Sequence, residues 1–234
     1  MKRLEELGRR YGVPPAGLEA LDAILAFQAE DPTAPTTVSE PGAAADRHVA
    51  DSLVAVDLPA VRHARRIADL GAGAGWPGLA LAAALPDARV ALVESAIRHC
   101  RYLERAVAAG RLENAEVVHA RAEEWADGLN AHDVVTARAV AALPVLCEYA
   151  APLLADGGLL VAWKGAVDED EAADGATAAA LLGLEPDEVL AVDPYPAAER
   201  RTLHLYRKVA PTPERFPRRA GMALKRPLVR RTPR

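Results

Sequence analysis

The residues with the clearest chemical potential form a glycine-rich turn in the first third of the chain. Residues 67–78 read I-A-D-L-G-A-G-A-G-W-P-G, so an apolar run ends in glycines and a proline precedes the next apolar run. This order is typical of a strand, a turn and the first turn of a helix. Glycine accepts positive φ and lets the backbone approach a ligand. Open α/β sheets bind nucleotides at the carboxyl end of the first strand, so the turn predicts a nucleotide site.

Two features leave the identity of that nucleotide open. Gly73, Gly75 and Gly78 satisfy the dinucleotide spacing G-x-G-x-x-G, although a lone glycine fingerprint has low specificity and also fits a tight turn without a ligand. Glu94 ends the apolar run Val90–Glu94, about 20 residues past the glycines, where an acid can bond a ribose diol. NAD and S-adenosylmethionine both satisfy this pattern, and a surface glutamate at a strand end is the structural alternative.

A third segment, residues 120–124, reads A-R-A-E-E after the next apolar run. In nucleotide-binding α/β folds this loop lies beside the adenine. The backbone N–H of Ala122 or Glu123 and the Glu123 carboxylate are therefore candidates to hold the ring edge. Acids are also common where helices begin, which is the alternative reading.

Two basic residues are expected at the same edge of the sheet. Arg138 follows the fourth expected strand, and an arginine there can bind a carboxylate or phosphate through two hydrogen bonds, or form a structural salt bridge. Lys164 ends the fifth expected strand after a Gly157-Gly158 turn. It is placed to contact a phosphate or the acids at residues 168–171.

The elements that position these residues alternate between strand and helix from residue 66 onward, which indicates a mostly parallel sheet covered on both faces. The last two strands are joined by D-P-Y-P at 193–196, so we expect an antiparallel hairpin at the sheet edge. The expected strands are 66–70, 90–94, 115–119, 133–136, 159–163, 188–192 and 203–207. The expected helices are 3–12, 15–29, 46–56, 77–85, 97–109, 143–154 and 169–182.

Composition supports one sizeable α/β domain with small appendages. The 234 residues are 51% hydrophobic and 26% charged, which argues against global disorder. The chain has two cysteines and no apolar leader after Met1, which predicts a reduced, cytoplasmic protein. It has no long uncharged apolar stretch and no zinc-ligand spacing, so we expect neither a membrane span nor a metal site. We expect an N-terminal helical extension over 1–60, a nucleotide-binding domain over 61–208 and a basic tail over 209–234.

The charge is distributed unevenly. Residues 207–234 contain ten Lys and Arg and one acid, a net charge of +9, whereas the rest of the chain carries −14. This asymmetry predicts a polyanionic partner at one end or, alternatively, a solvated tail.

Taken together, these elements resemble a Rossmann-like class I methyltransferase, which binds S-adenosylmethionine. The order that carries the resemblance is a glycine turn, an acid after strand two, Ala-Glu after strand three, Gly-Gly before strand five and a terminal hairpin. A dehydrogenase of this length would lack a substrate domain, and no clear hydride-handling residue is present.

Six motifs narrow the resemblance to the bacterial small-subunit ribosomal RNA methyltransferase G family, also known as glucose-inhibited division protein B. They resemble R-H-x-x-D-S, G-x-G-x-G-x-P-G, S-R-A, K-G, E-R-H-L and the tail T-P-x-x-[YF]-P-R…K-x-P-L. In this chain they fall at 46–53, 71–78, 137–139, 163–165, 199–203 and 212–228. One departure is the family's W-N-x-x-x-N-L-T segment, which corresponds here to residues 27–37 and contains no asparagine.

The resemblance implies methylation of N7 of one guanine in 16S ribosomal RNA by a monomer whose partner is the RNA or the small ribosomal subunit. Guanine N7 has a free lone pair, so transfer requires alignment rather than a general base. Arg138 and Lys164 are the expected catalytic residues. The implied cofactor contacts are Gly71, Ala72, Gly73, Gly75, Trp76, Glu94, Ser95, Ala122, Glu123 and Arg138. The implied RNA contacts are Arg47, His48, Arg218, Arg219, Lys225 and Arg226.

Three alternatives stay open at this stage: a methyltransferase for another RNA, one for a small molecule or protein, and a non-catalytic module that binds the cofactor. His48 is also open, because a histidine on a short helix is often a structural hydrogen-bonding residue.

Overall fold

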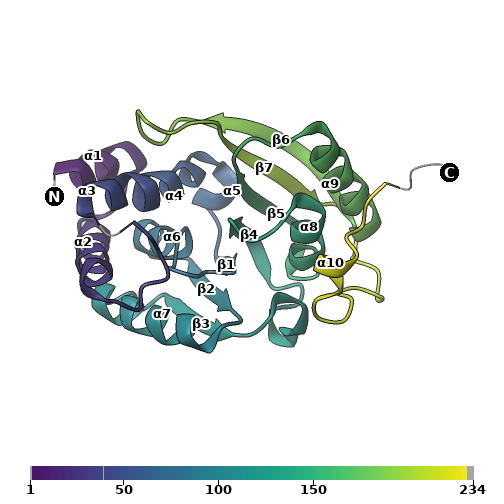
Figure 1. Cartoon of the computed structure of the whole chain (residues 1–234), viewed down its shortest axis with the longest axis horizontal. Coiled ribbons are helices and arrows are strands. Elements are labelled where there is room, and N and C mark those ends of the chain that lie inside the picture. The colour runs from purple at the N-terminus through teal and green to yellow at the C-terminus, as the bar shows by residue number, and fades with distance from the viewer. Residues whose placement is uncertain (1, 39, 231–234) are drawn as a thin grey trace.

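A seven-stranded sheet forms the centre of the computed structural model, which describes residues 2–38 and 40–230 (Figure 1). The strand order is β3-β2-β1-β4-β5-β7-β6. The first five strands pair in parallel, and β7 is antiparallel to both of its neighbours. The strands are β1 Arg66–Leu70, β2 Arg89–Glu94, β3 Ala115–His119, β4 His132–Arg138, β5 Leu154–Lys164, β6 Leu184–Val192 and β7 Arg201–Lys208.

Helices cover both faces of the sheet. Alternate residues of β1 and β4 enter two apolar clusters, one packed against the N-terminal helices and α6, the other against α8 and α9. Figure 1 shows the first group on the left and α8–α10 on the right. The helices are α1 Lys2–Tyr11, α2 Pro15–Glu30, α3 Pro41–Ala44, α4 Asp51–Leu53, α5 Pro59–Arg62, α6 Gly78–Ala84, α7 Ile97–Gly110, α8 Leu143–Ala150, α9 Glu169–Leu182 and α10 Met222–Lys225.

The expected fold class is confirmed, including the antiparallel terminal hairpin. The strands at 66–70 and 115–119 and the helix at 169–182 have the expected bounds. The helix is bounded by Asp168, whose carboxylate accepts from the Glu171 N–H, and by Gly183 in the left-handed conformation, so both of its ends carry local signals.

Two expected helices are wrong in detail. The segment 46–56 is not one helix: a π-helical turn, Ala45–Ala50, precedes α4, and a 3₁₀ turn, Val54–Asp57, follows it. The helix expected over 143–154 ends at Ala150, because the chain turns into β5 at Leu154. The Gly157-Gly158 pair then forms an irregularity within β5, with Gly157 at φ +76°.

The strand order creates a crevice between β1 and β4. The helix after β1 packs on one face of the sheet and the helix after β4 packs on the other, so the segments that follow these two strands diverge at the carboxyl ends of the strands. Ligands of open α/β sheets bind at such a point. Within residues 2–38 and 40–230, no helix is long and apolar enough to cross a membrane.

Candidate active site

The glycine turn between β1 and α6 has the backbone that its sequence predicts. Gly71, Gly73 and Gly75 have φ of +62°, +52° and +95°. A Cβ at Gly75 would lie 2.2 Å from a methyl carbon of Leu79, whereas one at Gly73 would meet nothing nearer than 3.7 Å. Gly75 is therefore needed for packing against α6. Gly73 leaves an open side where a ligand can approach the backbone.

A buried carboxyl group fixes the turn to the sheet. Asp69 accepts hydrogen bonds from the Gly78 N–H at 2.9 Å and from the Thr136 hydroxyl at 2.8 Å. Burial raises the pKa of Asp69 to about 6. These bonds join β1, β4 and the start of α6, and they fix the turn relative to the sheet.

Glu94 faces the turn from the end of β2. One carboxylate oxygen accepts from the Gly73 N–H at 3.0 Å and the other from the Ala96 N–H at 2.8 Å. The side chain is buried, and its carboxylate is held at the Gly73 N–H. This is the place from which an acid reaches a ribose diol, and that contact stays a prediction.

A smaller cavity of about 160 Å³ opens beside the turn and is lined by four of the ten expected cofactor contacts, Gly71, Ser95, Ala122 and Glu123. Its walls come from the loops after β1, β2, β3 and β4, from α8 and from the C-terminal segment. Its lining residues include Gly71, Ser95, Ala122, Glu123, Tyr149 and Leu224. The Glu123 carboxylate, however, accepts from the Gly221 N–H at 2.9 Å and is therefore engaged by the C-terminal segment.

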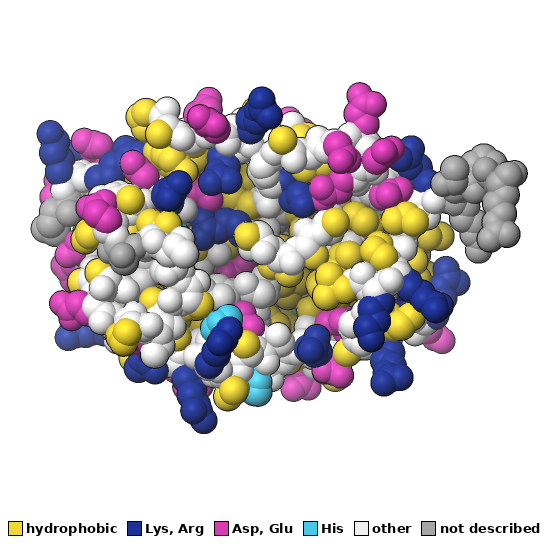
Figure 2. Space-filling view, viewed as in Figure 1, with side chains coloured by type: hydrophobic (Ala, Val, Ile, Leu, Met, Phe, Trp, Pro, Cys, Tyr) yellow, Lys and Arg dark blue, Asp and Glu magenta, His cyan; other side chains and the backbone are white. Residues whose placement is uncertain are grey.

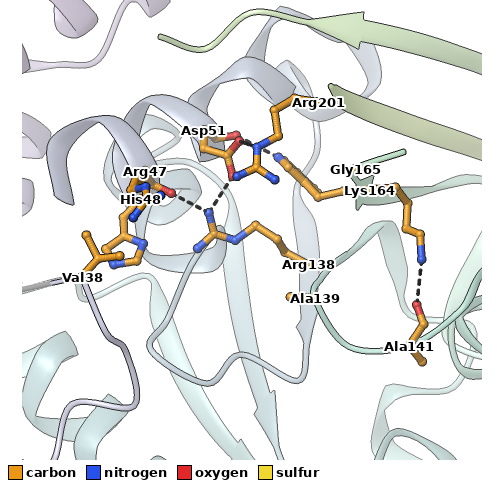
Figure 3. Close-up of a pocket in the computed structure, with 11 residues that line it drawn as sticks. Val38, Arg47, His48, Asp51, Arg138, Ala139, Ala141, Lys164, Gly165 and Arg201 are labelled. Atoms are coloured by element: carbon orange, nitrogen blue, oxygen red, sulfur yellow. Dashed lines mark hydrogen bonds and ion pairs between the residues drawn. The ribbon is translucent and has the colours of Figure 1, made fainter. Parts of the chain in front are cut away.

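A larger cavity of about 410 Å³ lies on the N-terminal side of the turn and is lined by basic residues (Figure 3). Arg138 donates to the Asp51 carboxylate at 2.8 Å and to the Arg47 carbonyl oxygen at 3.1 Å. Arg201 lies 3.5 Å from the other Asp51 oxygen. One buried carboxylate therefore orients two guanidinium groups toward the same space.

The pair formed by Asp51 and Arg201 has unused hydrogen-bonding capacity. Asp51 Oδ1 and Arg201 Nε are buried and have no hydrogen-bond partner among the described residues. Three arginines and one aspartate line the cavity, so its net charge is positive. Figure 2 shows a hollow near the centre of this face with Lys and Arg side chains standing within it. Such a cavity fits a phosphate or a carboxylate.

Lys164 lines the same cavity but is neutralised by another acid. Its Nζ lies 2.6 Å from Glu171 and donates to the Ala141 carbonyl oxygen at 3.3 Å. Figure 3 shows the side chain turned away from Asp51. Of the two contacts that the sequence allows for Lys164, the structure contains the one with the acids at 168–171.

Trp76 and His48 are placed differently from the expectation. The Trp76 indole is buried, donates to Gln28 at 2.9 Å and stacks on the His48 ring at a centroid distance of 5.5 Å. The indole thus points toward α2 and away from the smaller cavity. His48 bonds Thr36 and is only 7% exposed, so it forms a wall of the larger cavity rather than a free RNA contact. Burial, with Arg138 nearby, lowers the pKa of His48 to about 4.

The described part of the basic tail, residues 209–230, is folded against the protein, which changes the role expected for Arg218. Its guanidinium binds both carboxylate oxygens of Glu148, a fully buried residue of α8. The charge is used inside the fold, so Arg218 is not presented to RNA. Arg219, Lys225 and Arg226 are exposed, and Arg47 is exposed at the rim of the larger cavity.

Three site residues were missed by sequence reasoning. Asp51 stands inside the R-H-x-x-D-S motif, and Arg201 stands inside the altered E-R-H-L motif, so a signal existed for both. Gln28 falls where the family's W-N segment has its first asparagine. Its amide also donates to the Val38 carbonyl oxygen at 3.2 Å, which ties α2 to the segment before α3.

Comparisons with known proteins identify the family. The profile described as "rRNA small subunit methyltransferase G" matches residues 33–201. The chain belongs to this family. The relative from Desulfitobacterium hafniense is 39% identical over 197 residues, covering 83% of this chain and 81% of the relative. The relative from Rubrobacter xylanophilus is 43% identical over 195 residues, covering 81% and 75%. Both are named ribosomal RNA small subunit methyltransferase G.

Solved structures agree on the fold. A predicted O-methyltransferase from Agrobacterium tumefaciens superposes with a TM-score of 0.53 at 26% identity, over 69% of this chain and 80% of that one. A SAM-dependent O-methyltransferase from Thermotoga maritima gives 0.56 at 19% identity, over 70% and 66%. The chain is thus an S-adenosylmethionine-dependent methyltransferase with the class I fold. The open side of Gly73 and the smaller cavity are suited to this cofactor, and its contact with Glu94 stays a prediction.

Proposed function

We propose that this protein methylates N7 of a guanine in 16S ribosomal RNA, using S-adenosylmethionine. The observation that supports this most directly is the arginine-lined cavity beside the glycine turn. Arg47, Arg138 and Arg201 face it, and Asp51 holds the last two in place. An RNA phosphate beside the target base supplies the negative charge that this cavity lacks.

The side chains around the cavity suit a nucleophile that needs no deprotonation. His48 is a weak base because burial lowers its pKa to about 4, and the Asp51 carboxylate forms ion pairs with two arginines. Guanine N7 presents a lone pair in the major groove. The cofactor's sulfonium supplies an electrophilic methyl group, and the protein's contribution is alignment of the base with that group.

The names of the curated relatives favour the small-subunit RNA over other substrates. Exposed Arg219, Lys225 and Arg226 extend the basic surface beyond the cavity. We further propose that the protein acts as a monomer in the cytoplasm, where ribosomal RNA is made.

The test is transfer of label from radioactive S-adenosylmethionine to three substrates: undermethylated 30S subunits, 16S RNA freed of protein, and 50S subunits. We expect label on 16S RNA in at least one of the first two and none on the 50S control. Label found only on protein or small molecules would refute the ribosomal assignment.

A further inference from the structure

The C-terminal strap, defined here as residues 211–230, runs from the end of β7 back across α8 and α9. Phe216 and Ala223 are buried in the apolar cluster that contains α8. Arg218 binds Glu148 of α8, and Arg230 binds Asp174 of α9 at 3.2 Å. These contacts hold the strap at both of its ends, so it has a defined path over the molecule (Figure 1).

In the middle of its path the strap reaches the smaller cavity. The Gly221 N–H donates to the Glu123 carboxylate at 2.9 Å, and α10 begins at the next residue. The Leu224 side chain then lines the cavity opposite Gly71 and Ser95. Leu224, which is 101 positions after Glu123 in the sequence, thus completes the wall of that cavity.

Leu224 is an exposed apolar side chain that lines the smaller cavity. The residue is 56% exposed at the mouth of the cavity, although Ala223 beside it is buried. The cavity wall also includes Ser95 of the loop after β2, which follows Glu94, and residues 120–123 of the loop after β3. The loop after β3 is the one expected beside the adenine, whose ring has two apolar faces that gain from an aliphatic contact.

We propose that Leu224 covers one face of the adenine ring of S-adenosylmethionine, and that the hydrogen bond from Gly221 to Glu123 positions the strap next to the ring. Leu224 is thereby a binding residue for the adenosine part of the cofactor. The inference rests on the S-adenosylmethionine site described above. It assigns to the strap a role in cofactor binding that its charge alone does not indicate.

The experiment is calorimetric titration of Leu224→Ala with two probes, S-adenosylmethionine and 5′-methylthioadenosine. The second probe keeps the adenosine and lacks the amino acid part. Removing most of this half-exposed leucine side chain weakens the binding of each probe by about fivefold, because the same apolar contact is lost in both cases. Leu224→Met, which retains an apolar side chain, restores binding to within about twofold.

Val229→Ala is the matched control, because Val229 lies on the same strap, is 47% exposed and does not line the smaller cavity. It leaves both affinities unchanged. Slowed hydrogen exchange at residues 221–225 on addition of 5′-methylthioadenosine is the second readout.

Two outcomes overturn the proposal, and they are distinguishable. If the parent protein binds both probes and a folded Leu224→Ala protein binds them equally well, Leu224 does not cover the adenine. If the parent protein binds neither probe, the cofactor site itself is wrong.

Discussion

Replacing Asp51 by asparagine tests how the site is organised. The residue is 3% exposed and lies 2.8 Å from Arg138 and 3.5 Å from Arg201. Asparagine has nearly the same shape but lacks the charge, so both guanidinium groups lose their counter-ion while the packing is retained. We therefore expect an effect that is electrostatic in origin.

The magnitude follows from the burial of the three groups. Breaking a fully buried ion pair costs about 3–5 kcal/mol because a charge is left uncompensated. Here the Arg138 side chain is 17% exposed and that of Arg201 is 38% exposed, so water screens part of the loss. We expect the free energy of unfolding to fall by about 2 kcal/mol. We also expect kcat/KM for 30S subunits to fall at least about tenfold, because the two arginines lose their fixed orientation.

The assay is a double-mutant cycle of Asp51→Asn with Arg138→Met, measured by denaturant unfolding. Asp57→Asn is the matched control: this residue is exposed and its nearest arginine contact is 3.9 Å long, so we expect a change below about 0.5 kcal/mol. Residues in one ion-pair network show interaction energies of about 0.5–3 kcal/mol. Additivity of the Asp51 and Arg138 effects within about 0.3 kcal/mol would refute the reasoning.

Three further predictions concern other parts of the site. Glu94→Gln weakens the binding of S-adenosylmethionine by about tenfold in calorimetry, because a hydrogen bond to a charged acceptor is worth about 1.5–3 kcal/mol. An unchanged Kd would exclude the ribose contact. The pKa of His48 is about 4 in the fold against its ordinary 6.5, so the unfolded chain binds more protons between these values. Stability therefore falls by about 3 kcal/mol as the pH drops from 6.5 to 4, and His48→Gln removes this dependence. Asp69, whose pKa is raised to about 6, changes the stability in the opposite direction with pH, but it is present in both proteins and its effect cancels when they are compared. Equal slopes of stability against pH in the parent and in His48→Gln would contradict the lowered pKa of His48. Arg218→Met leaves Glu148 buried without its partner, and we expect about 3 kcal/mol less stability in thermal or denaturant unfolding. Unchanged stability combined with weaker RNA binding would instead support the RNA role.

The sheet could be predicted from the sequence because its strands carry local signals. β1 and β2 are buried on both faces, so each reads as a short apolar run that ends at the predicted ligand edge. The glycine turn and Glu94 could be placed for the same reason, since each directly follows such a run. Their closeness in space then follows from the parallel pairing of β1 with β2.

The irregular segment after α3 could not be predicted from periodicity. A single helix over 46–56 and the observed π, α and 3₁₀ turns bury nearly the same apolar residues. They differ in which side chains face the larger cavity, because each change of helix type rotates the residues that follow. The observed path places His48 against Trp76 and Asp51 against Arg138.

Contacts between distant residues could not be read from the sequence at all. Arg201 meets Asp51 across 150 positions, and Arg218 meets Glu148 across 70. The basic composition of the tail predicts attraction to a polyanion, but it contains no information about a buried acid on α8. This is why composition alone points Arg218 to RNA, whereas the structure pairs it with Glu148.

The central claim is the chemistry of the transferred methyl group. The most direct measurement is to incubate the protein with isotopically labelled S-adenosylmethionine and undermethylated 30S subunits, digest the 16S RNA to nucleosides and identify the labelled one by mass spectrometry. We predict that the label is recovered as N7-methylguanosine. Label in another methylated nucleoside would contradict the proposed alignment of N7 in the arginine-lined cavity.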